Sequence, residues 1–179
     1  MPHSVKWRGV GNQDIHRAVQ EILAARQLDT LLAATRSWAR KLTGADGVTF
    51  VLRAGDSCYY ADEDAIEPLW KGQRFPAVKC VSGWVMRHGD PVMIPDIYAD
   101  ARVLHDAYRP TFVKSMLMVP VRKADPIAAI GAYWKTLHAP TADHVRVVEV
   151  LAEAAAISLS SEQLWTRAQE EIRTVTSRQ

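Results

Sequence analysis

The stretch from Cys80 to Pro120 constrains the fold more than any other part of this chain, because turns, apolar runs and polar residues alternate in it in a definite order. A short helix is predicted at residues 84–88, and the apolar run 92–94 predicts a short strand that a proline ends. A segment rich in Asp, Tyr and His follows at 96–115, which we call the lid. The run 115–121 is almost wholly apolar and is typical of a strand covered on both faces. This order predicts a pocket with a sheet as its floor and the lid as its roof.

Helical periodicity occupies both ends of the chain. Apolar residues recur at helical spacing between residues 12 and 43 and again from Thr141 almost to the end. Between these ends, 47–53 and 57–61 form a predicted hairpin, and 127–134 is a further apolar strand candidate. Strands that cluster between terminal helices indicate an α+β fold with an antiparallel sheet. We expect the terminal helices on one face of this sheet and the lid over the other.

Composition argues against several classes of protein. The net charge is only +2, and no block of Lys or Arg resembles a site for nucleic acid. Two cysteines, Cys58 and Cys80, without a CxxC spacing argue against a disulfide framework and favour a reduced compartment. The sequence has no signal-peptide pattern and no apolar run of about 18 residues. We therefore expect a cytoplasmic protein that binds neither membranes nor nucleic acid.

Three groups of residues resemble the GAF domain, a small-molecule-binding sensory module. They are SGWVMRHGDPVMIPDI (82–97), VKSMLMVPV (113–121), and the pair IGAYW (130–134) with HVRVVEVLAEAAAISL (144–159). The run CYYADEDAIEPLWKGQRFP (58–76) is similar, more narrowly, to GAF domains placed ahead of PAS and kinase modules in bacterial sensor histidine kinases. The resemblance covers roughly residues 15–162.

The resemblance implies a central antiparallel sheet of five or six strands, helices on one face, and a lid-covered pocket on the other. It divides the chain into a loose N-terminus (1–14), a GAF domain (15–162) and a C-terminal signalling-type helix (163–179). GAF domains commonly form homodimers through such terminal helices. A narrow apolar seam suits this use, although a frayed terminal helix explains it as well. The seam residues are Ile157, Ser161, Leu164, Ala168, Ile172 and Val175.

The pocket implied by the resemblance makes one set of residues candidates for binding a ligand. Aromatic side chains with polar tips suit a planar or polar small molecule. The candidates are Cys80, Trp84, Tyr98, His105, Tyr108, Phe112 and Met118. The alternative is that the lid is an ordinary polar surface segment, with Tyr98 and Phe112 as core anchors. The acidic stretch 62–79 is interpreted as mostly loop, with Asp62, Glu63 and Asp64 simply solvated.

The identity of the ligand stays open, and three GAF cofactors are disfavoured. The segment before the 113–121 strand lacks the cysteine that attaches a covalent bilin in bilin-binding relatives. The signature of cyclic-nucleotide-binding relatives is absent. His105 could ligate haem, but a lone histidine is more often a surface or core residue. No metal site is predicted.

Functionally, we expect a non-enzymatic sensory domain, because no kinase, triad or metalloprotease motif occurs. It would be the input module of a bacterial two-component protein, with a kinase or PAS module downstream. One alternative is a thiol redox sensor or GAF-fold reductase built on Cys80. Against it, the position of Cys80 suits a small buried apolar residue, and the chain lacks the additional nearby cysteine that reductase chemistry normally uses. Another alternative is a ligand-free dimerisation scaffold.

Overall fold

The computed structural model describes residues 11–137 and 140–178. Six strands form one antiparallel sheet in the spatial order β3-β2-β1-β6-β5-β4. Their bounds are β1 Gly47–Ala54, β2 Ser57–Ala65, β3 Arg74–Pro76, β4 Val92–Ile94, β5 Ser115–Val121 and β6 Ala128–Trp134. The expected α+β fold with an antiparallel sheet is therefore confirmed.

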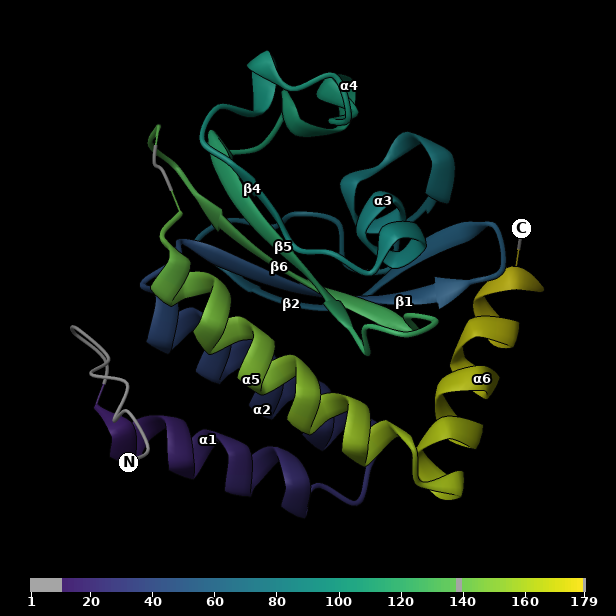
Figure 1. The fold of residues 1–179 in the computed structure, drawn as a ribbon. Helices are drawn as coiled ribbons and strands as arrows, with labels where there is room; N and C mark the ends of the chain where they lie inside the picture. Colours follow the sequence, from purple (N-terminus) through teal and green to yellow (C-terminus); the bar gives the residue numbers. More distant parts are fainter. Residues whose placement is uncertain (1–10, 138–139, 179) are drawn as a thin grey trace.

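Helices cover both faces of the sheet (Figure 1). The terminal helices α1, α2 and α5 lie on one face, as expected, and α3 lies on the opposite face together with the lid and its short helix α4. The helical elements are α1 Asn12–Ala24, α2 Leu28–Thr43, the 3-10 turn η1 Ala77–Lys79, α3 Val81–His88, the 3-10 turn η2 Ile97–Ala99, α4 His105–Tyr108, α5 Ala142–Leu159 and α6 Glu162–Thr176. Of the N-terminus expected to be loose, residues 1–10 lie outside the described residues, and α1 begins at Asn12.

The sheet separates two apolar clusters, and strand alternation supplies both. On β5, Leu117 and Val119 belong to the cluster beneath α1, α2 and α5, which we call the helix-side cluster. Met116 and Met118 point the other way, into the lid-side cluster. All residues of β5 and β6 are buried. The prediction that 115–121 is a strand covered on both faces is thus confirmed.

The acidic stretch after Cys58 differs from the prediction. Asp62, Glu63 and Asp64 belong to β2 and are not a solvated loop. Asp62 is only 7% exposed, and it accepts hydrogen bonds from Arg36 of α2 (2.5 Å) and Lys71 (2.9 Å). Burial alone would raise the pKa of Asp62, but these two cationic donors outweigh it and lower the pKa. These residues pair with β1, and the ion pair with Arg36 neutralises Asp62 within the strand. Hydrophobic periodicity along the sequence gives no sign of such an ion pair.

The C-terminal helix also departs from expectation, because it is two helices. Helix α5 ends at Leu159, and Ser161 caps α6 by accepting a hydrogen bond from the Leu164 amide. Helix α6 turns back alongside the sheet (Figure 1). Its residues Leu164 and Ala168 are buried in the helix-side cluster of the same chain. Most of the predicted seam therefore packs on its own domain, whereas Ile157 stays 63% exposed.

The buried Asp62 predicts how stability depends on pH. Its pKa is lowered in the folded state, so its contribution is complete above the unfolded carboxyl pKa of about 4 and is lost as pH falls through the folded value. We expect Asp62→Asn to lower the free energy of unfolding at neutral pH by about 2 kcal/mol. We also expect the variant to lose less stability than the parent on acidification. Urea titrations across pH measure both effects.

The control is Asp125→Asn, which breaks ion pairs of a carboxylate that is 79% exposed. Such pairs contribute little, and we expect a change below about 0.5 kcal/mol. Equal losses for the two variants would contradict the assignment of Asp62 as the buried anchor between α2 and β2.

Candidate functional site

The space between the sheet and the lid, where a ligand pocket was expected, is occupied by side chains. These side chains come from β1, β2, β4, β5 and β6, from α3, and from the loops on either side of it. The buried members of this lid-side cluster are Val51, Cys58, Tyr60, Leu69, Trp70, Cys80, Val81, Val85, Met86, Val92, Ile94, Ile97, Val103, Tyr108, Val113, Met116, Met118, Ala129 and Tyr133.

Trp70 joins the aromatic residues of this cluster. Its ring centroid lies 5.5 Å from that of Tyr60, 4.6 Å from that of Tyr108 and 5.4 Å from that of Tyr133. Its indole Nε1 donates a hydrogen bond of 3.0 Å to the carbonyl oxygen of Ala107, in the lid. One residue of the 66–73 loop thus closes the space below the lid and ties the loop to the lid.

Glu63 holds Trp70 in this position. One carboxylate oxygen accepts the Leu69 amide (2.9 Å), and the other accepts the amides of Trp70 (2.8 Å) and Lys71 (2.9 Å). Three backbone donors on one carboxylate fix the loop as firmly as a helix cap fixes a helix end. Trp70 was not among the predicted site residues, because prolines and charged residues dominate the stretch that carries it. The apolar pair Leu69-Trp70 within a polar stretch was the available signal.

The buried tyrosines of the cluster are neutral, and two of them are hydrogen-bonded through their hydroxyls. The Tyr133 hydroxyl lies 2.9 Å from the Thr49 hydroxyl, and the Tyr60 hydroxyl lies 3.3 Å from that of Ser82. Burial raises the pKa of Tyr60, Tyr108 and Tyr133. The space next to Tyr133 requires glycine at position 131, since a Cβ there would lie 2.3 Å from the phenol oxygen. The cluster is therefore aromatic and uncharged, with a few polar tips.

The lid is fixed by its own hydrogen bonds. His105 Nε2 lies 3.0 Å from the carbonyl oxygen of Ile97 and 3.1 Å from that of Asp100, so it donates to the lid backbone. This use of Nε2 fits a structural role better than ligation of haem. Asp100 forms a two-pronged pair with Arg102, and this pairing lowers the pKa of the carboxyl.

The predicted ligand-binding residues separate into two groups. Cys80, Tyr108 and Met118 lie buried in the lid-side cluster, and Trp84 and Phe112 pack against it. Tyr98 is 38% exposed, so it is not the core anchor that the alternative reading suggested, whereas Phe112 does pack on the cluster. Tyr98 and His105 lie on the lid with ring centroids 5.5 Å apart.

The two cysteines meet inside the cluster. Cys58 on β2 and Cys80, the N-cap residue of α3, place their sulfur atoms 3.3 Å apart as free thiols. The statement that Cys80 lacks a nearby second cysteine is therefore wrong. Sequence spacing did not reveal the contact, because the β2–β3 hairpin and η1 bring the two positions together.

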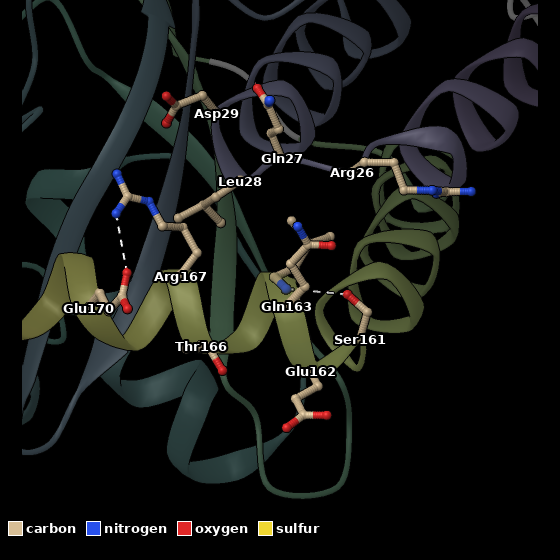
Figure 2. Close-up of a pocket in the computed structure, with 11 residues that line it drawn as sticks. Arg26, Gln27, Leu28, Asp29, Ser161, Glu162, Gln163, Thr166, Arg167 and Glu170 are labelled. Atoms are coloured by element: carbon tan, nitrogen blue, oxygen red, sulfur yellow. Dashed lines mark hydrogen bonds and ion pairs between the residues drawn. The ribbon is translucent and has the colours of Figure 1, made fainter.

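A hollow of about 910 Å³ lies elsewhere, between the α1–α2 junction and α6 (Figure 2). Its lining mixes polar residues, among them Arg26, Asp29 and Glu162, with Leu28 and Leu164, and Arg167 pairs with Glu170 at 3.2 Å. The hollow shows that α6 is packed only in part along its length. It contains none of the predicted ligand-binding residues.

Residues 11–137 and 140–178 present neither a cluster of metal ligands nor a membrane-spanning helix. In that part of the chain, no group of three or more His, Cys, Asp or Glu side chains is placed to hold a metal ion. No helix within it combines the length and the apolar character that a bilayer span requires.

Comparison with solved structures finds the same fold in proteins of low sequence identity. The GAF domain of an Acinetobacter phosphoenolpyruvate-protein phosphotransferase matches with a TM-score of 0.74 at 14% identity, over 89% of this chain and 96% of that one. Free methionine-R-sulfoxide reductase from Neisseria meningitidis matches at 0.66 and 18% identity, over 80% and 87%. The chromophore-binding domain of an unusual bacteriophytochrome, RpBphP3 from R. palustris, matches at 0.69 and 14% identity, over 82% of this chain and 59% of that one.

The sequence comparisons complete the assignment. The search among curated proteins gave no match. The family model of the GAF domain matches residues 25–160, which is most of the chain and includes the whole sheet. Since the family match and the fold agree, this chain belongs to the GAF domain family.

Proposed function

We propose that this GAF domain is a non-enzymatic sensory module that couples the packing of its lid-side cluster to the docking of α6. One observation carries the proposal: strand β2 contributes to both. Tyr60 of β2 lies in the lid-side cluster. Its neighbour Tyr59 lies in the helix-side cluster, which also holds the buried residues of α6. A change on one face of β2 thus reaches α6 through a single strand.

Polar contacts at the edge of the sheet also hold α6. Arg74 of β3 pairs with Tyr59 in the sheet and donates a 2.6 Å hydrogen bond to Thr176, at the end of α6. Burial raises the pKa of Tyr59, and the charge and hydrogen bond of Glu171 on α6 add to this. The far end of α6 therefore rests on β2 and β3.

The docking of α6 is weak enough to be regulated. Leu164 and Ala168 are its buried residues, and their burial stabilises the docked position by about 2–3 kcal/mol. The hollow on one side of α6 leaves that side of the helix incompletely packed, so it adds little to the stability of the docked position (Figure 2). A ligand shifts the equilibrium between docked and undocked α6 only by its difference in affinity for these two states. Coupling free energies between sites are typically about 1–3 kcal/mol, so a docking energy of about 2–3 kcal/mol lies within reach of a ligand.

The proposed input is a small, largely planar molecule that takes the place of Trp70. The aromatic side chains around Trp70 suit such a ligand. The loop that carries Trp70 is held by hydrogen bonds from its backbone amides to the Glu63 carboxylate. In this proposal the lid residues Tyr98 and His105 control entry. We further propose a bacterial, cytoplasmic regulator with a kinase or PAS module downstream, on the basis of the resemblance of residues 58–76.

We predict that Trp70→Ala creates a site for indole. The substitution removes a buried indole, so it destabilises the fold by about 3–5 kcal/mol and leaves an apolar cavity. Excess indole should raise the Tm of the variant and should slow hydrogen exchange in residues 162–176. Differential scanning fluorimetry and exchange mass spectrometry measure the two effects.

The matched control is Trp165→Ala, since Trp165 lies on α6 and is partly exposed. Indole should leave the Tm of this variant unchanged. If indole stabilises Trp70→Ala without altering exchange in α6, the cavity exists but the coupling to α6 is wrong.

We also propose that the chain forms a homodimer through the terminal helices. Leu23 of α1 and Ile157 of α5 are exposed apolar residues on the side of the domain that the terminal helices cover. Both residues line the same hollow between these helices. We expect Ile157→Glu to shift the mass in multi-angle light scattering from dimer towards monomer. Val78→Glu, a change at a more exposed position on η1, should leave the mass unaltered. A monomeric parent protein would refute the homodimer.

A further inference from the structure

The thiols of Cys58 and Cys80 form a pair that the sensory function does not use. Their sulfur atoms are 3.3 Å apart, and a disulfide bond requires about 2.0 Å, so an approach of about 1.3 Å closes the bond. The two residues sit on different elements, β2 and the start of α3, which are linked by β3 and η1.

The surroundings make the two sulfurs unequal. Cys80 accepts a 3.3 Å hydrogen bond from the Ser82 hydroxyl at the N-terminus of α3. The pKa of Cys80 is lowered, first by its hydrogen bond with Cys58 and then by Ser82, the Gly83 amide and the charge of Arg87. The same contact and burial raise the pKa of Cys58. The protonated Cys80 thiol has the Pro76 carbonyl oxygen as an acceptor at 3.5 Å, whereas the Ser82 hydroxyl and the start of α3 stabilise its thiolate. Cys80 is therefore the thiol that we expect to act as the nucleophile.

Access also distinguishes the two thiols. Cys58 is 0% exposed and Cys80 is 8% exposed. Cys80 directly follows η1, whose residue Val78 is 74% exposed. Of the two thiols, Cys80 is therefore the one closer to solvent.

We propose that Cys58 and Cys80 form a reversible intramolecular disulfide when the domain meets a hydroperoxide. The Cys80 thiolate attacks the terminal oxygen of the hydroperoxide, and the O–O bond of the hydroperoxide breaks. Cys80 becomes a sulfenic acid, and the alkoxide that leaves takes a proton from water to form an alcohol. The Cys58 sulfur then attacks the Cys80 sulfur, the S–O bond breaks, and the hydroxide leaves as water with the Cys58 proton. Two thiols lose two electrons in all and the peroxide gains two. An added dithiol reverses the bond by exchange.

The effect of this bond on α6 rests on the proposed function, whereas the chemistry of the pair does not. Cys58 precedes Tyr59, the β2 residue near Glu171 of α6, and pairs across the sheet with Phe75, next to Arg74. A disulfide bond that moves Cys58 towards α3 displaces β2 and its neighbour β3, the two strands on which the end of α6 rests. We expect oxidation to change hydrogen exchange in residues 162–176.

The experiment exposes the whole chain to cumene hydroperoxide, quenches with N-ethylmaleimide under denaturing conditions, and measures intact mass and peptides. We expect both thiols to disappear together, the mass to fall by two hydrogens, and a peptide linking Cys58 to Cys80. Dithiothreitol should restore two alkylated thiols. Two thiols that persist in the folded protein, or a Cys80 that goes to sulfinic acid with Cys58 reduced, would overturn the proposal.

Single variants separate the two roles. In Cys58→Ser, Cys80 should remain as a sulfenic acid that dimedone labels, and in Cys80→Ser the buried Cys58 should stay reduced. Rapid oxidation of Cys58 in Cys80→Ser would contradict the assigned order of steps. A disulfide that forms without any change of exchange in α6 would leave the thiol pair intact and would count only against the coupling to α6.

Discussion

The fold depends on a sheet whose inner strands contribute side chains to an apolar cluster on each of its two faces. In β5 and β6 every residue is buried, so each strand supplies one row of side chains to the helices and one row to the lid. Burial on both faces fixes strand register, since a slip by one residue would exchange the two rows. The two clusters are therefore linked through the strands they share, and this link is the physical basis of the proposed relay.

The lid-side cluster shows how this GAF domain fills the space beneath its lid. Trp70 reaches the aromatic residues from a loop, and the Glu63 carboxylate holds that loop through three backbone amides. Neither residue contributes to the regular hydrophobic pattern of the strands. The position of the loop thus depends on directional bonds from Glu63 as well as on the packing of Trp70 in the lid-side cluster.

The sequence predicted well what depends on local pattern and poorly what depends on contacts between distant elements. Periodicity located the sheet and the terminal helices, and the GAF motifs placed α3, β4 and the lid in order. Strand β2 extends to Ala65 by pairing with β1, and Asp62 within it finds its partner Arg36 on α2. The meeting of Cys58 and Cys80, and the return of α6 onto the sheet after Ser161, are likewise products of tertiary packing. No spacing along the chain encodes these contacts directly.

A double-mutant cycle tests the central claim most directly, namely that the lid-side cluster and α6 are energetically coupled through β2. Trp70→Phe perturbs the cluster and Leu164→Ala perturbs α6, and their unfolding free energies are measured singly and together. Distant, independent substitutions add to within about 0.5 kcal/mol. The account predicts an interaction energy above that limit. Additivity within it would contradict the relay, and the two faces of the sheet would then respond independently.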